Sequence, residues 1–210
     1  MKLYEIFDAL GVRELLRRVY RIEVVGGDHI PDTGPAILAA NHESLADPFF
    51  LGVATTRPIH YMAKAELWRN PILGRVMDWF GTFPVERGGG DSRALRHGIR
   101  LLEQGAVLGI FPQGTASPHR HRPFLRGAAR LALATGAPLV PVCMINTEKA
   151  LRPRRVKIGF PRILIRVAPA LRVEKQRATV AVARDLTRLV EDAIAELRHP
   201  FGQPAHAWIE

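Results

Sequence analysis

One stretch decides the fold: Ala36-Ile37-Leu38-Ala39-Ala40-Asn41-His42-Glu43-Ser44-Leu45-Ala46-Asp47-Pro48-Phe49-Phe50. An apolar run of strand length ends in a polar cluster, and a second apolar run follows it. Because such a pattern is typical of a strand that turns into a helix, the polar cluster is predicted to form the loop between them.

His42 and Asp47 are the chemically notable residues of this loop. In a regular helix, five positions correspond to roughly 500° of rotation, so the two side chains can meet only if the chain turns between them. Asp47 can be an N-cap with Pro48 at the first helical position, or Ser44 and Asp47 can form a capping-box-like pair one turn earlier. Both put His42 on the loop with one imidazole nitrogen held by the carboxylate and the other free as a base. A satisfied loop pair without catalysis is the alternative.

Length and charge narrow the classes of function. The 210 residues suit one domain, and a hydrophobic fraction of 47% is ample for a core. The 30 Lys and Arg residues against 20 Asp and Glu give a net charge of +10. Such a surface attracts nucleic acid, anionic lipid headgroups or phosphorylated small substrates. The single cysteine, Cys143, excludes an internal disulfide and lies in an apolar run, which predicts a buried, unreactive thiol.

Residues 3–20 are predicted to form an amphipathic helix, because apolar residues recur near helical spacing and arginines occupy other positions. This helix either packs on the domain or lies at a membrane interface with its arginines on anionic headgroups. Glu5 and Asp8 argue against a signal peptide. No stretch reaches the ~18 apolar residues that a membrane span needs. If the protein meets a membrane, we expect it to lie on the surface.

The rest of the chain alternates predicted strands and helices. We expect extended segments over 21–25, 36–40, 59–63, 82–85, 106–111, 139–145, 156–160 and 163–167. We expect helices over 49–55, 71–80, 92–104, 125–135 and 174–197. The last two strands are predicted to form a hairpin around Pro161.

This alternation predicts a single-domain α/β fold, in which a mixed, mostly parallel sheet with an antiparallel edge is flanked by helices. We divide the chain into an N-terminal amphipathic helix (1–20), a main domain (21–200) and a tail (201–210).

A second polar loop follows the predicted strand 106–111 and reads Phe111-Pro112-Gln113-Gly114-Thr115-Ala116-Ser117. Its backbone N–H groups and hydroxyls suit an oxyanion or a phosphate, although an ordinary turn has the same composition.

With this loop, the sequence resembles the 1-acylglycerol-3-phosphate acyltransferase family of glycerolipid acyltransferases. Four blocks match in order over about two thirds of the chain: Asn41 to Asp47 (N-H-x4-D), Gly81 to Arg87, Phe111 to Ser117, and Val140 to Val142.

The resemblance implies the glycerolipid acyltransferase fold and a reaction. A fatty acyl group would move from a thioester, either acyl-CoA or acyl-carrier protein, to the free hydroxyl of 1-acyl-glycerol-3-phosphate, giving phosphatidic acid in phospholipid biosynthesis. His42 would take the proton of the hydroxyl, and Asp47 would fix the tautomer of His42 and stabilise the imidazolium. Backbone N–H groups near Gly114 are candidates for binding the oxyanion.

His42 and Asp47 are therefore the predicted catalytic residues. The predicted substrate-binding residues are Lys64, Arg87, Gln113, Gly114 and Thr115. Among these, Arg87 and Lys64 are the candidates for the phosphate of the acceptor.

The third block departs from the family pattern at two positions. Gln113 stands where the family usually has Glu, and Ala116 stands where it usually has Arg. Because a fixed positive charge is lost, the same chemistry on another lyso-lipid acceptor is the alternative function. Arg120, Arg122 and Arg126 are candidates for replacing that charge.

No metal and no cofactor beyond the thioester co-substrate are expected, because His119 and His121 fall in an arginine-flanked polar loop. A lipid acceptor and product reside in the bilayer, so we expect a peripheral protein on the anionic cytoplasmic face of the cell membrane. A non-catalytic basic module that binds membrane or nucleic acid is the rival class. The basic patches lack interleaved aromatic residues, and no helix-turn-helix or zinc pattern occurs, so no nucleic-acid partner is expected.

Overall fold

The centre of the sheet is built from three strands whose residues are almost all buried. They are β2 (Ala36–Ala40), β5 (Val107–Ile110) and β6 (Leu139–Ile145). β2 pairs in parallel with β5 on one side and with β6 on the other. Burial on both faces is what an interior parallel strand requires, and it explains why these stretches read as continuous apolar runs.

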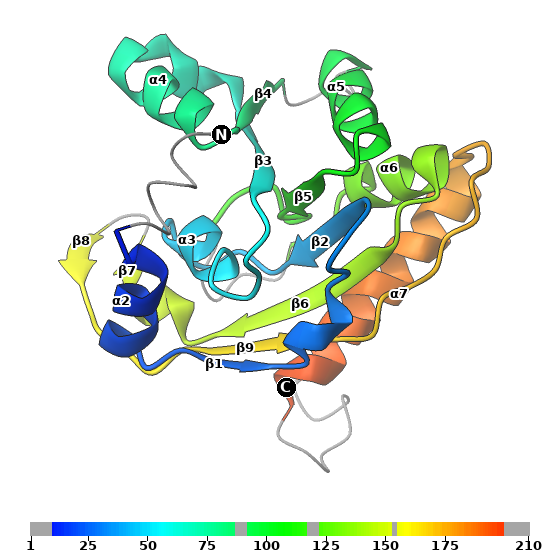
Figure 1. Cartoon of the computed structure of the whole chain (residues 1–210). Helices are drawn as coiled ribbons and strands as arrows, with labels where there is room; N and C mark the ends of the chain where they lie inside the picture. Colours follow the sequence, from blue (N-terminus) through cyan, green and yellow to red (C-terminus); the bar gives the residue numbers. More distant parts are fainter. Residues whose placement is uncertain (1–9, 87–91, 117–121, 153–154, 200–210) are drawn as a thin grey trace.

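In the computed structural model, which describes residues 10–86, 92–116, 122–152 and 155–199, seven strands form one sheet in the order β1-β9-β6-β2-β5-β3-β4 (Figure 1). The outer strands are β1 (Glu23–Val25), β3 (Ile59–Lys64), β4 (Phe83–Val85) and β9 (Leu164–Val167). β9 is antiparallel to β6 and parallel to β1, and the other pairs are parallel. The prediction of a mostly parallel sheet with an antiparallel side is confirmed.

Helices cover both faces of the sheet (Figure 1). One face packs against α5 (Ser92–Glu103), α6 (Gly127–Thr135) and α7 (Val180–Arg198). The other face packs against α3 (Asp47–Leu51) and the segment that follows α2 (Val12–Val19). The remaining described helical elements are α4 (Pro71–Trp79) and the 3-10 turns η1 (Gly27–His29), η2 (Ala65–Arg69) and η3 (Thr147–Lys149).

Gly109 in β5 provides room for an aromatic side chain near the carboxyl ends of the strands. A Cβ at this position would lie 2.4 Å from Cε1 of Tyr61 and 2.9 Å from Cγ2 of Ile59. The ring of Tyr61 therefore crosses β5 at the glycine, and its hydroxyl donates to the Pro48 carbonyl at 2.7 Å. This contact ties β3 to the start of α3.

Within the described residues, the helix predicted over residues 3–20 is confirmed as α2 from Val12 to Val19, but its extension through Gly11 is wrong. Gly11, at φ 65°, occupies the left-handed region that favours glycine, and α2 begins only at Val12. Residues 3–9 lie outside the described residues. Arg13 donates to the carbonyls of Gly52 and Thr55, so this arginine holds α2 on the domain.

The hairpin predicted around Pro161 is also wrong. β8 (Arg155–Ile158) pairs with β7 (Leu151–Arg152), whereas β9 enters the main sheet between β1 and β6. The alternating residues Ile163, Ile165 and Val167 are buried there. β9 therefore gains a hydrophobic core that a solvent-facing hairpin would not offer.

The last helix begins six residues later than predicted. Thr179 caps α7 by accepting a hydrogen bond from the Val182 N–H at 3.3 Å. Upstream, the Gln176 N–H donates to the Leu133 carbonyl, so this segment runs along α6 instead of coiling. The domain boundaries at residues 20 and 200 stay predictions.

Candidate active site

Asp47 organises the loop that follows β2. Its Oδ2 accepts three hydrogen bonds: from the backbone N–H groups of Glu43 and Ser44, at 2.7 and 2.8 Å, and from Nδ1 of His42 at 2.8 Å. The Ser44 hydroxyl accepts from the Ala46 N–H, which completes a capping-box-like arrangement. The two predicted alternatives were Asp47 as the N-cap and a capping-box-like pair of Ser44 and Asp47, and the second is observed. The N-cap residue of α3 is Ala46, not Asp47.

Burial differs sharply within the pair. The Asp47 side chain is 0% exposed, whereas that of His42 is 15% exposed. The imidazole therefore has one nitrogen held by a buried carboxylate and one nitrogen left for a proton transfer. This arrangement is that of a general base with an orienting acid.

The loop after β5 fixes His42 from a second side. Phe111 stacks on the imidazole with ring centroids 4.3 Å apart and planes inclined by 23°. The side-chain oxygen of Gln113 accepts the backbone N–H of His42. Behind Phe111, Tyr61 stacks at 6.1 Å. The backbone and the ring of His42 are thus both restrained by residues of the loop after β5.

Two neighbours of His42 anchor the loop to β6 and beyond. The Asn41 side chain donates to the Met144 carbonyl and accepts the Met144 N–H, so its amide continues the pairing of β2 with β6. The Ser44 hydroxyl donates to the Leu151 carbonyl at 2.9 Å. The half-buried Arg198 at the end of α7 forms an ion pair with the Glu43 carboxylate. Burial of Arg198 is the largest single influence and lowers its pKa, but the Glu43 carboxylate and Cys143 together outweigh it, so the pKa of Arg198 is raised.

The Glu43–Arg198 pair leads to a stability prediction. Arg198→Met leaves a carboxylate that is only 11% exposed without its cation. We expect it to lower the free energy of unfolding by about 1–2 kcal/mol, a value reduced by the 50% exposure of the Arg198 side chain. The melting temperature should fall by roughly 3–6 °C in circular dichroism. The double variant Glu43→Gln/Arg198→Met should melt closer to wild type, because no unpaired charge remains. A double variant that melts below Arg198→Met would contradict this account.

His42 forms part of the wall of a groove of about 1300 Å³ at the carboxyl ends of β2, β5, β3 and β4. In open parallel sheets this edge is where ligands bind. Much of the lining is apolar and comes from α3, β3, η2 and α4 or from residues next to them: Leu45, Phe49, Met62, Leu67, Leu73, Met77 and Phe80. The groove therefore offers an apolar chain a place beside a base.

Positive charge enters the same groove from two directions. Lys64 lies at the end of β3, and Arg126 and Arg130 lie at the start of α6. None of these three has a hydrogen bond or an ion pair with another side chain in the part of the chain that the structure describes. The groove thus combines apolar walls with cations, as a lipid with a phosphate headgroup requires.

Most of the predicted site residues come together. Lys64, Gly114 and Thr115 line the groove with His42, and Asp47 lies behind His42. Gln113 contacts the His42 backbone, and its role as a substrate contact stays a prediction. Arg87 lies outside the described residues, as does Arg120, one of the proposed replacements for the missing arginine. Arg126 does line the groove.

The other described histidines and Cys143 lie outside the groove that His42 lines. His29 bonds the Val167 carbonyl, and His60 bonds the Gly81 carbonyl. Burial lowers the pKa of His60 and of His97. Cys143 is buried as predicted, and burial raises the pKa of its thiol to about 11. Among the described histidines, only His42 lines the groove.

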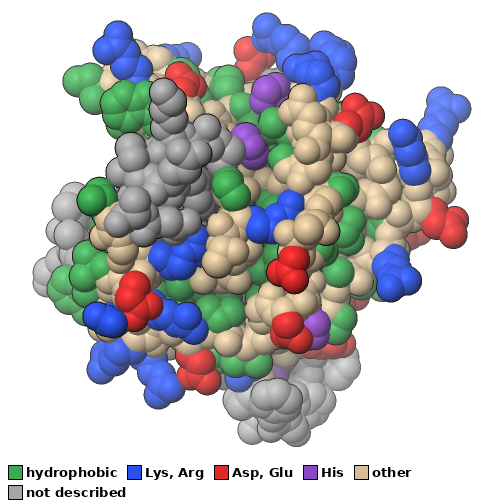
Figure 2. Space-filling view, in the orientation of Figure 1, with side chains coloured by type: hydrophobic (Ala, Val, Ile, Leu, Met, Phe, Trp, Pro, Cys, Tyr) green, Lys and Arg blue, Asp and Glu red, His purple; other side chains and the backbone are tan. Residues whose placement is uncertain are grey.

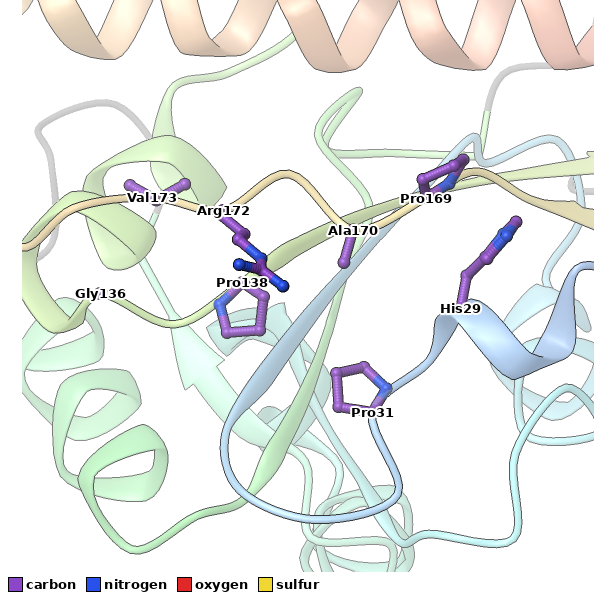
Figure 3. Close-up of a pocket in the computed structure, with 8 residues that line it drawn as sticks. All are labelled: His29, Pro31, Gly136, Pro138, Pro169, Ala170, Arg172 and Val173. Atoms are coloured by element: carbon purple, nitrogen blue, oxygen red, sulfur yellow. The ribbon is translucent and has the colours of Figure 1, made fainter.

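A second cavity, of about 570 Å³, lies at the opposite edge of the sheet, before β2 and β6 and after β9 (Figure 3). Figure 3 shows His29 and Arg172 on its wall among prolines and small residues. Nδ1 of His29 bonds the Val167 carbonyl and no carboxylate lines this cavity among the described residues, so the cavity lacks a His–carboxylate pair like that of His42 and Asp47.

The distribution of surface charge and the length of the helices indicate which kinds of binding partner the protein suits. Figure 2 shows Lys and Arg side chains spread over the visible face with acidic side chains between them, not gathered in one patch. Within the described ranges, no helix has the length and apolar character for crossing a membrane. Within the same ranges, no three His, Cys, Asp or Glu side chains cluster as metal ligands, and His119 and His121 lie outside them.

Comparisons with known proteins agree with this geometry. A family model described as Acyltransferase matches residues 21–145. The 1-acyl-sn-glycerol-3-phosphate acyltransferase of Bacillus subtilis is 35% identical over 136 residues, which cover 64% of this chain and 68% of the relative. The protein of the same name from Borreliella burgdorferi is 28% identical over 179 residues, which cover 84% of this chain and 71% of the relative.

The fold is also similar to that of a solved structure. The crystal structure of the 1-acyl-sn-glycerophosphate (LPA) acyltransferase from Thermotoga maritima aligns with a TM-score of 0.69 and covers 91% of this chain and 82% of that one. At 22% sequence identity, this likeness concerns the fold alone.

Proposed function

The chain belongs to the acyltransferase family, and from that premise we propose that it transfers a fatty acyl group from a thioester to the free hydroxyl of 1-acyl-glycerol-3-phosphate, giving phosphatidic acid. The observation that carries this proposal is the His42–Asp47 pair on the wall of a groove that has apolar and cationic lining. The names of the relatives supply the acceptor, and phospholipid biosynthesis is the proposed pathway.

The proposed reaction begins with a proton transfer. Nδ1 of His42 is held by Asp47, so Nε2 takes the proton of the acceptor hydroxyl as its oxygen attacks the thioester carbonyl. The new C–O bond gives a tetrahedral oxyanion, and Asp47 stabilises the imidazolium. Collapse breaks the C–S bond, and the imidazolium returns its proton to the departing thiolate. No covalent enzyme intermediate, cofactor or metal takes part in this scheme.

The oxyanion needs preorganised donors, and the loop after β5 is next to His42. The Gly114 N–H already donates to the Phe111 carbonyl at 2.9 Å and is not available. Thr115 also lines the groove, and its amide and hydroxyl have no hydrogen-bond partner among the described residues. We therefore assign the oxyanion to Thr115 rather than to Gly114.

The acceptor is proposed to lie with its acyl chain along the α4 side of the groove. Leu73 and Met77 of α4 line the groove, and Lys64 at the end of β3 is the cation on that side. Lys64 would bind the acceptor phosphate as a point charge, together with Arg87. Because Ala116 stands where the family usually has a positively charged arginine, another lyso-lipid stays the alternative acceptor.

A membrane surface is the proposed location, on its cytoplasmic face and without a span. α4 lines the groove with one side, and on its other side Ile72 and Trp79 are 76% and 61% exposed. Exposed apolar side chains beside a lipid-sized groove suit insertion into a headgroup layer. The net charge of +10 suits anionic lipid, and no nucleic-acid partner is proposed.

The test measures thiol release from palmitoyl-CoA with a panel of acceptors. We expect turnover that depends on lysophosphatidic acid. Lys64→Met should raise the KM for this acceptor about tenfold at nearly constant kcat, because a charge-assisted contact with phosphate is lost. Lys175→Met, a matched change at an exposed lysine outside the groove, should leave KM unchanged. Faster turnover with a different lyso-lipid would identify that lipid as the acceptor instead. Thiol release at the same rate with and without every acceptor would refute the transfer reaction.

A further inference from the structure

The start of α6 carries two arginines that face the groove. Arg126 is the N-cap residue of the helix, and Arg130 closes its first turn by donating its N–H to the Arg126 carbonyl at 2.9 Å. Both arginines are exposed to solvent and line the groove. Neither guanidinium has a hydrogen-bond or ion-pair partner among the described residues.

This placement is electrostatically unfavourable for the helix on its own. The N-terminus of a helix carries the positive end of its dipole, which disfavours cations there. Like charges four positions apart on a helix also repel each other. The first turn of α6 contains no acidic residue that would offset either effect. An anion bound between the two guanidinium groups would offset both.

A second helix start lies beside this pair. Ala178, Thr179 and Val180 line the groove, and they mark the beginning of α7, a helix of 19 residues. α6 and α7 pack side by side, as Figure 1 shows. The first turn of α7 also contains no acidic residue. Two arginines and two helix N-termini therefore direct positive potential at the same end of the groove.

This cationic end is separate from Lys64. α6 packs against β2 and β6, whereas Lys64 ends β3, which lies on the far side of β5 from β2. His42 follows β2 and lines the same groove. A single acceptor phosphate on Lys64 leaves the α6 end of the groove for a different anion.

We propose that Arg126 and Arg130, with the N-terminus of α7, bind the phosphates of an acyl-CoA donor. The inference rests on the proposed function, because it assigns the donor of the same reaction. CoA carries a diphosphate and a 3′-phosphate, and planar guanidinium groups bind phosphate oxygens in pairs. Two arginines on successive turns match several phosphates better than the single phosphate of a carrier-protein thioester.

Equilibrium binding of CoA, measured by calorimetry in physiological salt, tests the site without any turnover. Arg126→Ala and Arg130→Ala should each weaken the Kd by about fivefold, and the double variant by about thirtyfold. Arg172→Ala is the matched control, because Arg172 lines the cavity at the opposite edge of the sheet. Dephospho-CoA, which lacks the 3′-phosphate, should bind wild type more weakly and lose less affinity in the double variant.

Steady-state kinetics distinguish a binding site for the donor from a binding site for the acceptor. The double variant should show a raised KM for palmitoyl-CoA, an unchanged KM for lysophosphatidic acid, and wild-type rates with palmitoyl N-acetylcysteamine, a thioester without phosphates. A raised KM for lysophosphatidic acid alone, or equal losses in the Arg172→Ala control, would overturn the proposal. So would a wild-type protein that uses acyl-carrier protein and does not bind CoA. Loss of CoA binding in the variants of a protein that acylates no glycerolipid would refute the proposed function and leave this site standing.

Discussion

Replacing His42 with alanine should lower kcat by about a thousandfold and leave the KM of both substrates within about twofold. The acceptor hydroxyl is a poor nucleophile at neutral pH, and His42 is the described histidine on the groove wall. The measurement is thiol release from palmitoyl-CoA at saturating lysophosphatidic acid. Because Cys143 is buried and burial raises its pKa to about 11, a thiol-reactive dye should report released CoA with little background from the folded protein.

The fold should survive this substitution, since the loop is held by its backbone. The His42 N–H donates to Gln113, and the N–H groups of Glu43 and Ser44 donate to Asp47, whatever the side chain at position 42. His29→Ala is a matched control, because His29 lies at the other cavity and should leave kcat unchanged.

The space left by the imidazole lies against Phe111 and opens on the groove, so added imidazole should restore part of the rate. A variant at position 42 that keeps more than a tenth of the wild-type kcat would show that another group is the base.

The pairing of His42 with Asp47 could be predicted because it is local. Five residues, a capping pattern and a preceding apolar run determine that the chain turns there, and the structure shows the predicted Ser44–Asp47 pair. The groove could be anticipated for a similar reason. Lys64 and Gly114 each follow a strand, and parallel strands that end at one edge bring the following residues together.

The contacts that restrain His42 could not be predicted from the sequence. Gln113 reaches His42 across 71 residues, and Arg198 reaches Glu43 across 155. Neither partner carries a local signal, because any loop glutamine or helix-terminal arginine has the same appearance. The prediction of a hairpin around Pro161 was wrong for the same reason. Alternation of apolar and polar residues identifies a strand but not the strand with which it pairs.

The sequence predicts the cations of the groove only in part. Arg126 is one of three candidates in a basic stretch, and no pattern distinguishes Arg130, because a predicted helix over 125–135 does not by itself show which face its arginines take. Their shared orientation depends on how α6 packs against β2 and β6. A four-residue spacing at the start of a helix with no acidic residue in its first turn is the signal that was available.

Asp47→Asn should lower kcat by about a hundredfold to a thousandfold while the protein stays folded. The amide oxygen can replace Oδ2 and accept from His42, Glu43 and Ser44, whereas the opposite orientation would set an NH₂ group against three N–H donors. The NH₂ group then takes the place of Oδ1, which is buried and has no hydrogen-bond partner among the described residues. An unsatisfied donor there costs ~1–2 kcal/mol of stability. Because the charge that stabilises the imidazolium is lost, the rate of the chemical step should fall. The affinity for the substrates should stay unchanged.

Asp47→Ala separates orientation from folding, because it also removes the acceptor of the Glu43 and Ser44 N–H groups. It should lower kcat at least as far as Asp47→Asn and reduce the melting temperature more. The double variant His42→Ala/Asp47→Asn gives the decisive comparison. If Asp47 acts through His42, the double variant should be no slower than His42→Ala alone, since groups that act as a unit are not additive. If the two reductions in kcat multiply in the double variant, Asp47 acts on the substrate by a route that does not pass through His42. A kcat for Asp47→Asn within fivefold of wild type would show that the carboxylate stabilises the loop and does not take part in the reaction.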